Sequence, residues 1–228
     1  MSSPIIDVRD VVLRRDGRVI LEDVNFTVDR GDFIAVTGPN GGGKTTLLRL
    51  MLKLISPTAG EVVYIGSDGQ PVPRLNIGYL PQKNLIDSKF PITVEEVVAT
   101  GLLNVKGLGR GEVRRRVEST LDEIQMSDRR SSPIGEISGG QLQRALLGRA
   151  IISRPDVLML DEPLSYLDRH FIDETYGLLG GIAKDTTIVL VSHELSGISK
   201  MANRHLIVDR FVKPCHSHSH VIPPPCEV

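Results

Sequence analysis

A glycine-rich segment between an apolar run and a helix-like stretch constrains the fold of this chain more than any other feature. The segment reads Gly38-Pro-Asn-Gly-Gly-Gly-Lys44-Thr45; it follows a short, mostly apolar run at 32–36 and opens the stretch 44–54, which ends before Pro57. Its glycines let successive backbone N–H groups turn inward around an anion, and a helix N-terminus adds partial positive charge. The pattern predicts a strand–loop–helix unit that holds the phosphates of a nucleotide.

Within this loop, the side chains of Lys44 and Thr45 have the chemistry that a triphosphate requires. Lys44 would place its ammonium at the β- and γ-phosphates, and Thr45 would offer its hydroxyl to Mg²⁺. A flexible glycine-rich turn is the alternative, and the flanking strand and helix argue against it. The predicted phosphate-binding residues are Gly38, Pro39, Asn40, Gly41, Gly42, Gly43, Lys44, Thr45 and Thr46.

A pair of carboxylates follows a second apolar run. Residues 157–160 are Val-Leu-Met-Leu, and Asp161-Glu162 comes next. In an open α/β sheet, ligands bind at the carboxyl ends of the strands. Asp161 would hold Mg²⁺ directly or through water, and Glu162 would polarise the attacking water as a general base. An acidic turn at the end of a strand is the alternative, and the phosphate loop in the same chain favours the catalytic interpretation.

The N-terminal part of the chain reads as β-rich around this loop. Strand patterns occur at 5–14 and 19–28, on either side of a turn at Asp16-Gly17, and again at 61–65 and 76–80. We expect these segments to form an N-terminal antiparallel region and to contribute strands to the sheet that carries the loop.

The remainder alternates between helical and strand patterns. Residues 83–137 are predicted to be an inserted helical sub-domain, in which Thr93 and Glu96 form a capping box. Further elements are predicted at 111–125 (helix), 139–150 (helix), 157–160 (strand), 169–183 (helix), 186–191 (strand) and 205–208 (strand). Continuous apolar strands alternating with helices predict an α/β fold with a mainly parallel sheet covered on both faces.

The chain length fits one large domain, predicted at residues 1–213, followed by a polar tail at 214–228. Both cysteines, Cys215 and Cys226, lie in the tail, which excludes a disulfide framework for the core. Neutral imidazoles and thiolates are good Zn²⁺ ligands. The tail therefore offers a candidate metal site, with a plain disordered polar tail as the alternative; its residues are Cys215, His216, His218 and His220.

A second glycine motif, Ser138-Gly139-Gly140-Gln141, precedes the apolar positions Leu142, Leu146 and Ala150. Ser138 can cap a helix that begins at Gly139, leaving N–H groups and a positive dipole at that end. An ordinary N-cap is the alternative that the motif alone leaves open.

Together these segments resemble the ATP-binding subunits of ABC transporters, over residues 5–211. Residues 38–45 are similar to the Walker A loop of that family, 157–162 to its Walker B strand, and 137–141 to its signature motif. The resemblance implies a P-loop NTPase core, ATP and Mg²⁺ as cofactors, and ATP hydrolysis. It also implies a head-to-tail dimer with a second copy, in which the signature motif of one chain (Ser138, Gly139, Gly140 and Gln141) closes on the ATP of the other.

The resemblance assigns roles to further residues. Gln82, after Gly78-Tyr-Leu-Pro81, is similar to the Q-loop glutamine, which senses Mg²⁺ and contacts the membrane partner. His193 is similar to the switch histidine that contacts the γ-phosphate, and Asp168 ends a segment similar to the D-loop. The resemblance thus implies Glu162, His193 and Gln82 as catalytic residues and Thr45, Gln82 and Asp161 at Mg²⁺.

The chain departs from the family pattern at several positions. Arg15 occupies the place of an aromatic residue that stacks on adenine; a guanidinium plane can also stack on a base, and a surface charge is the alternative. Tyr166 stands in the D-loop-like segment where a small residue is more usual, and Gly42 and Thr45 stand where Ala and Ser are commoner.

The segment 90–98, which begins Phe-Pro-Ile-Thr-Val, resembles the branch of the family that serves manganese, zinc or iron uptake. This resemblance implies a permease as partner and an extracytoplasmic solute-binding protein as an indirect one. An importer or exporter ATPase for another solute is the alternative, and a non-transport ABC ATPase is a further one. The net charge of −1 and the absence of Trp argue against a nucleic-acid partner. No apolar run approaches the roughly 20 residues of a membrane span, so we expect a peripheral subunit at the cytoplasmic face, held by the permease.

Overall fold

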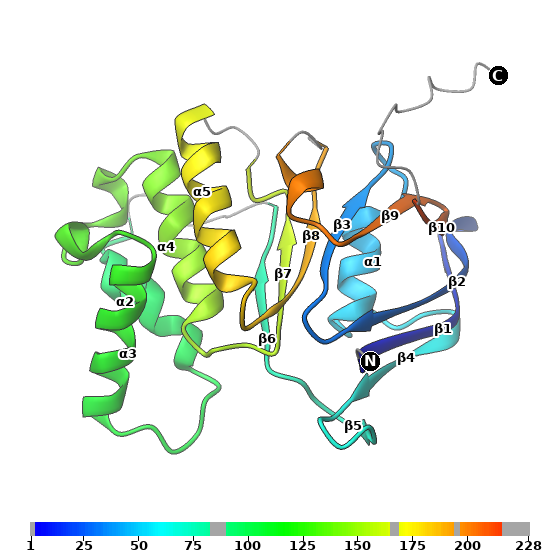
Figure 1. Ribbon diagram of the computed structural model, residues 1–228, viewed down its shortest axis with the longest axis horizontal. Helices are drawn as coiled ribbons and strands as arrows, with labels where there is room; N and C mark the ends of the chain where they lie inside the picture. Colours follow the sequence, from blue (N-terminus) through cyan, green and yellow to red (C-terminus); the bar gives the residue numbers. More distant parts are fainter. Residues whose placement is uncertain (1–2, 83–89, 165–168, 194–196, 216–228) are drawn as a thin grey trace.

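The structure of the protein, a computed structural model, describes residues 3–82, 90–164, 169–193 and 197–215. Two β-sheets form the right-hand and central parts of the molecule in Figure 1, and most of the helices gather on the left. The predicted α/β architecture with an antiparallel N-terminal region is confirmed.

The first sheet is antiparallel, with strand order β2-β1-β4-β5. Its strands are β1 (Pro4–Arg15), β2 (Arg18–Asp29), β4 (Ala59–Ile65) and β5 (Pro71–Val72). The turn between β1 and β2 uses positive φ angles at Asp16 and Gly17, 50° and 74°, as the Asp-Gly pair predicts. The two-residue strand β5 was not predicted, because Pro71-Val72 is too short to show a periodic pattern.

The second sheet has the order β10-β9-β3-β8-β7-β6, and its strands are parallel except for the edge strand β10, which runs antiparallel to β9. They are β3 (Phe33–Thr37), β6 (Ile77–Leu80), β7 (Val157–Asp161), β8 (Thr187–Val191), β9 (Arg204–Asp209) and β10 (Phe211–Pro214). Every residue of β3, β7 and β8 is buried, which is why these strands read as unbroken apolar runs. The unpredicted β10 extends through Pro214, the residue at which the predicted tail begins.

The helices cover this sheet and extend it sideways. They are α1 (Lys44–Met51), α2 (Val94–Ala99), α3 (Arg110–Glu123), α4 (Gly139–Ile151) and α5 (Arg169–Ile182), with short 3-10 turns η1 (Thr100–Leu102), η2 (Ser127–Arg129), η3 (Ile134–Glu136) and η4 (Ile198–Lys200). Helix α1 lies between the two sheets, whereas α2, α3 and α4 pack together beyond the edge strand β6 (Figure 1). None of the described helices is both long enough and apolar enough to span a bilayer.

Helix ends follow local chemistry. The predicted capping box is present: the Glu96 carboxylate accepts the Thr93 N–H at 2.8 Å, and the Thr93 hydroxyl accepts the Glu96 N–H at 3.4 Å. Helix α1 was predicted to reach residue 54, but it ends at Met51 because Lys53 adopts a left-handed backbone with φ of 54°.

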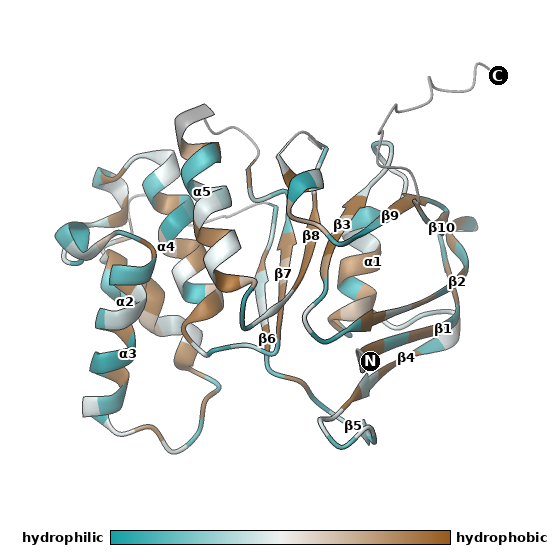
Figure 2. Cartoon of the chain, in the orientation of Figure 1, coloured by the Kyte–Doolittle hydropathy of each residue, from teal (hydrophilic) through white to brown (hydrophobic). Residues whose placement is uncertain are grey.

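Two apolar clusters stabilise the fold. One joins α1 to the antiparallel sheet and includes Leu48 and Val24. The other joins α2, α3 and α4 to the far face of the parallel sheet and includes Val98, Leu121 and Leu146. Figure 2 shows the hydrophobic residues concentrated on the central strands and the hydrophilic residues on the outer turns of α3. The sheet therefore has a helix layer on each face, and its strand ends are left to form a site.

Candidate nucleotide-binding site

The glycine-rich loop connects β3 to α1, as its sequence predicts. Its backbone has positive φ at Gly38, Gly41 and Gly43, 141°, 77° and 104°. A Cβ on Gly38 would lie 2.0 Å from the carbonyl oxygen of Val208, and one on Gly43 would lie 2.9 Å from Cδ2 of Leu21. Backbone conformation and close packing both require glycine here, whereas Gly41 faces open space.

Lys44 begins α1 and turns its side chain back over the loop. Its ammonium donates to the carbonyl oxygens of Gly38 and Pro39, each at 3.0 Å. The side chain is buried, and burial lowers the pKa of Lys44, although the negative charges of Glu162 and Asp161 oppose that shift. The loop thus holds a partly desolvated positive charge at its centre, which favours an anionic ligand.

Asp161 ends β7 beside the start of α1. Its Oδ1 accepts a hydrogen bond from the Thr45 hydroxyl at 3.2 Å. Its Oδ2 is buried without a hydrogen-bond partner among the described residues. Burial raises the pKa of Asp161, and the Thr45 hydroxyl opposes the rise. A buried carboxylate oxygen without a donor, beside a hydroxyl, fits a hard cation with oxygen ligands such as Mg²⁺.

Glu162 follows the strand with φ of 51° and donates its N–H to the Val191 carbonyl at 3.0 Å. Its carboxylate accepts a hydrogen bond from Nε2 of Gln82 at 2.8 Å, and the other oxygen lies 2.8 Å from Nε2 of His193. The sequence-predicted catalytic residues Glu162, Gln82 and His193 therefore meet. They do so because β6, β7 and β8 are adjacent parallel strands whose carboxyl ends share one edge.

The second glycine motif forms the N-terminus of α4. The Ser138 hydroxyl accepts the Gln141 N–H at 3.2 Å, and the Gln141 side-chain oxygen accepts the Ser138 N–H at 2.9 Å, so the predicted N-cap is confirmed as a capping box. Ser138 and Gly139 are exposed, whereas Gly140 is buried, and a Cβ there would lie 2.5 Å from the Phe171 ring. No hydrogen bond or ion pair between described residues joins this motif to the phosphate loop of the same chain.

Other predicted site residues lie apart or outside the described part of the chain. Arg15 is exposed at the end of β1, opposite Arg18 in the hairpin. Asp168 lies outside the described residues, as does Tyr166. Of the predicted tail site, Cys215 is described, whereas His216, His218 and His220 lie outside the described residues.

Two backbone carbonyls of the site accept hydrogen bonds that the sequence did not predict. The Arg210 N–H, in the turn between β9 and β10, donates to the Gly42 carbonyl at 3.1 Å. Nε2 of Gln143, in α4, donates to the Pro163 carbonyl beside Glu162 at 2.8 Å. Both contacts join residues far apart in sequence through a backbone carbonyl, so no residue pattern signals them.

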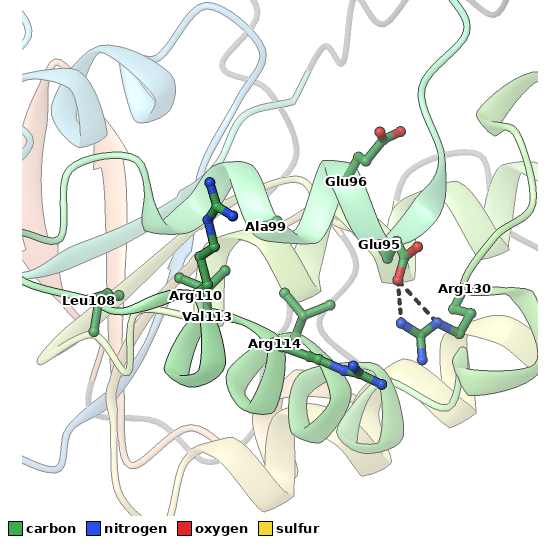
Figure 3. Close-up of a pocket in the computed structure, with 9 residues that line it drawn as sticks. Glu95, Glu96, Ala99, Leu108, Arg110, Val113, Arg114 and Arg130 are labelled. Atoms are coloured by element: carbon green, nitrogen blue, oxygen red, sulfur yellow. Dashed lines mark hydrogen bonds and ion pairs between the residues drawn. The ribbon is translucent and has the colours of Figure 1, made fainter.

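A surface groove of about 350 Å³ lies between α2 and α3 (Figure 3). Arg130 closes one end through an ion pair with Glu95, with Nη2 and Oε2 2.6 Å apart. The lining combines charged and apolar side chains: Glu95, Glu96, Ala99, Leu108, Arg110, Val113, Arg114, Val117 and Arg130.

Known proteins share sequence and fold with this chain. A family model described as ABC transporter matches residues 21–165. The zinc uptake system ATP-binding protein ZurA of Listeria innocua is 34% identical over 228 residues, covering 96% of this chain and 89% of that protein. The zinc import ATP-binding protein ZnuC of Pasteurella multocida is 32% identical over 211 residues, covering 92% and 74%. A metal-chelate type ABC transporter solved in an inward-facing conformation aligns with a TM-score of 0.81 at 27% identity, covering 93% of this chain and 83% of that one.

Proposed function

The chain belongs to the ABC transporter family as an ATP-binding subunit that hydrolyses ATP, and we propose that this hydrolysis drives uptake of a divalent transition-metal ion through a separate permease. The main support for the ATPase mechanism is that Gln82 and His193 both contact the Glu162 carboxylate, beside the phosphate loop. The names of the relatives, zinc uptake and zinc import proteins, support a metal ion as the transported solute.

In the proposed mechanism, residues of this chain bind the nucleotide and prepare the attacking water. The loop N–H groups and Lys44 hold the triphosphate, and Glu162 orients the water and accepts its proton. Gln82 and His193 fix the Glu162 carboxylate in place, which limits the orientations that the base can adopt. Thr45, Asp161 and Gln82 would hold Mg²⁺, which when bound offsets the charge of the phosphates.

We propose that the exposed signature motif binds the nucleotide held by a second copy of the chain. Ser138 and Gly139 present a capped helix N-terminus to solvent, where backbone N–H groups and the helix dipole favour an anion. Because no hydrogen bond or ion pair between described residues joins this motif to its own phosphate loop, we propose that it closes on the ATP of a partner chain. Asp168 would lie at the same interface, and Arg15 would stack on the adenine.

The groove between α2 and α3 is the surface that we assign to the permease. Helix α2 begins at Val94, shortly after Gln82, so a contact there lies close in sequence to the catalytic cluster. Phe90 before α2 and Leu103 after η1 are 59% and 82% exposed, and both offer apolar area for contact with a partner. A short amphipathic helix of the permease, apolar on one face and charged on its flanks, fits this surface. A solute-binding protein on the other side of the membrane would deliver the ion.

The test is transport by the reconstituted complex. The chain is co-purified with its permease, placed in vesicles, and supplied with ATP and radiolabelled Zn²⁺, with Mn²⁺ and iron as competitors. We expect ATP-dependent zinc accumulation that the Glu162→Gln variant abolishes. If Zn²⁺, Mn²⁺ and iron leave ATP hydrolysis unchanged and none of them is transported, the metal assignment is rejected and another solute is favoured. Movement in the opposite direction would identify an exporter, and failure to bind any permease would favour a non-transport ABC ATPase.

A further inference from the structure

Glu162 leaves β7 through a backbone turn that few residues with a side chain adopt. Its φ of 51° lies in the left-handed region. A residue other than glycine stays in that region only where its surroundings hold it there. The direction in which the Glu162 side chain projects depends on this backbone, so the contacts that hold the turn also orient the carboxylate.

Two contacts from different elements hold the turn. On the side of β8, the Glu162 N–H donates to the Val191 carbonyl at 3.0 Å. On the side of α4, Nε2 of Gln143 donates to the Pro163 carbonyl at 2.8 Å. Proline has no backbone N–H, so this carbonyl is the only backbone group of Pro163 that a hydrogen bond can hold. The Gln143 amide thus fixes the turn from the helix side, one residue beyond Glu162.

The surroundings of the Gln143 amide favour this hydrogen bond over one with water. Pro163 is buried, and the two residues border a small internal space whose lining is mostly apolar and includes Leu80, Leu147 and Leu160. The space, about 10 Å³, is at the lower limit for one water molecule. A polar group in such surroundings is costly to leave without a partner. The Pro163 carbonyl therefore has in Gln143 a donor that solvent does not easily replace.

The backbone of α4 is itself held closely against the rest of the chain. A Cβ on Gly78 of β6 would lie 2.2 Å from the Ala150 carbonyl oxygen, and one on Gly101 of η1 would lie 2.0 Å from the Arg149 carbonyl oxygen. Backbones that approach so closely leave the helix no room to slide. Gln143 therefore projects from a rigid element, as a side chain that must hold another residue in position requires.

We propose that Gln143 is a positioning residue for ATP hydrolysis, which holds the Glu162 turn so that the carboxylate faces the attacking water. This inference rests on the proposed role of Glu162 as the base. Gln82 and His193 contact the carboxylate at the end of the side chain, whereas Gln143 acts on the backbone from which that side chain departs. Loss of the Gln143 amide should therefore slow the chemical step and leave ATP binding unchanged.

The first experiment examines the turn in the full chain without nucleotide. Hydrogen exchange of the Glu162 amide is measured for the wild type, Gln143→Met and Gln125→Met. Methionine has a length similar to that of glutamine but no N–H donor, so little space opens for a water that could take over the hydrogen bond. Gln125→Met is the matched control, because the Gln125 side chain accepts a hydrogen bond from Arg144 of the same helix at 3.3 Å.

The Glu162 amide should exchange at least about threefold faster in Gln143→Met than in the wild type, and at the wild-type rate in Gln125→Met. Exchange of amides in β3 corrects for any change in global stability. An unchanged rate in Gln143→Met would overturn the proposal. So would an equal increase in Gln125→Met, because the substitution would then loosen the region as a whole.

The second experiment separates chemistry from binding. Phosphate release by the chain assembled with its permease is measured over a range of ATP concentrations. Gln143→Met should lower kcat by about tenfold and leave KM unchanged within about twofold, and Gln125→Met should change neither. An unchanged kcat in Gln143→Met would overturn the catalytic role, even if the Glu162 amide exchanges faster.

A Glu162→Gln background distinguishes a loss of positioning from damage to the nucleotide site. This background should bind ATP without hydrolysing it, and adding Gln143→Met should alter neither the affinity for ATP nor the amount of ATP-bound dimer. A weaker affinity or less dimer would overturn the proposal, because Gln143 would then serve nucleotide binding. Full hydrolysis by Glu162→Gln alone would reject Glu162 as the base and with it the catalytic role of Gln143, whereas the exchange measurement tests the contact by itself.

Discussion

The two glycines of the signature motif should respond in opposite ways to the same added methyl group. A Cβ on Gly139 meets nothing within 4 Å, whereas one on Gly140 would lie 2.5 Å from Cδ1 and 2.7 Å from Cε1 and Cγ of Phe171. The Phe171 ring cannot retreat freely, because the Arg144 guanidinium lies 5.4 Å from its centroid. Arg144 is itself ion-paired with Glu174 of α5.

Two contributions set the expected difference in the free energy of unfolding between the two alanine variants. Replacing Gly by Ala within a helix stabilises the fold by about 0.5–1 kcal/mol in both variants. Overpacking costs about 1–3 kcal/mol and applies only at Gly140. The helix term cancels in the comparison, so Gly140→Ala should unfold with a free energy about 1–3 kcal/mol lower than that of Gly139→Ala.

Urea unfolding followed by circular dichroism measures this difference, since the chain has no Trp for fluorescence. In a Phe171→Leu background the penalty of the added methyl at Gly140 should shrink, because the ring no longer occupies the space. Gly139→Ala should be at least as stable as the wild type yet lower ATP hydrolysis in the assembled complex, since Gly139 is assigned to the partner's nucleotide. Equal unfolding free energies for the two alanine variants would refute the packing argument.

Three further outcomes are expected. Glu162→Gln should retain ATP binding and lose hydrolysis by at least about a hundredfold, measured as phosphate release; undiminished turnover would remove Glu162 from the role of base. Lys44→Ala should weaken ATP binding at equilibrium by about tenfold to a hundredfold, since a charge-assisted contact with phosphate is lost, and an unchanged affinity would contradict the loop assignment. Tyr64 donates to the Met51 carbonyl at 2.7 Å, and burial raises the pKa of Tyr64 to about 12. The folded pKa is raised above the unfolded value near 10, so wild-type stability should fall between about pH 10 and 12 by on the order of 2 kcal/mol more than in Tyr64→Phe, and parallel pH profiles would contradict this.

The sequence predicted best where one local pattern decides the structure. The buried strands β3, β7 and β8 read as apolar runs because both of their faces are covered. The helix caps at Thr93 and Ser138 could be predicted because a capping box lies within four consecutive residues. The prediction for α1 was wrong at its C-terminus, because the left-handed turn at Lys53 has no strong residue signal.

For the candidate site, too, the sequence predicts some features and not others. The phosphate loop could be predicted from contiguous residues, because its function depends on backbone geometry that glycine permits. The hydrogen bond from Gln82 to Glu162 and the contact between His193 and Glu162 could not be derived from spacing, because they depend on the strand order. The roles of Arg15 and Asp168 remain predictions.

By itself, the sequence predicted that this chain binds a triphosphate and which residues would carry the chemistry, because each motif is short and acts through its own backbone. The tertiary structure alone decided which of them meet. Adjacent parallel strands bring Gln82, Glu162 and His193 to one edge, while α4 turns the signature motif outward. It also placed the β9–β10 hairpin against Gly38 and Gly42, since contacts between backbones distant in the chain leave no trace in residue patterns.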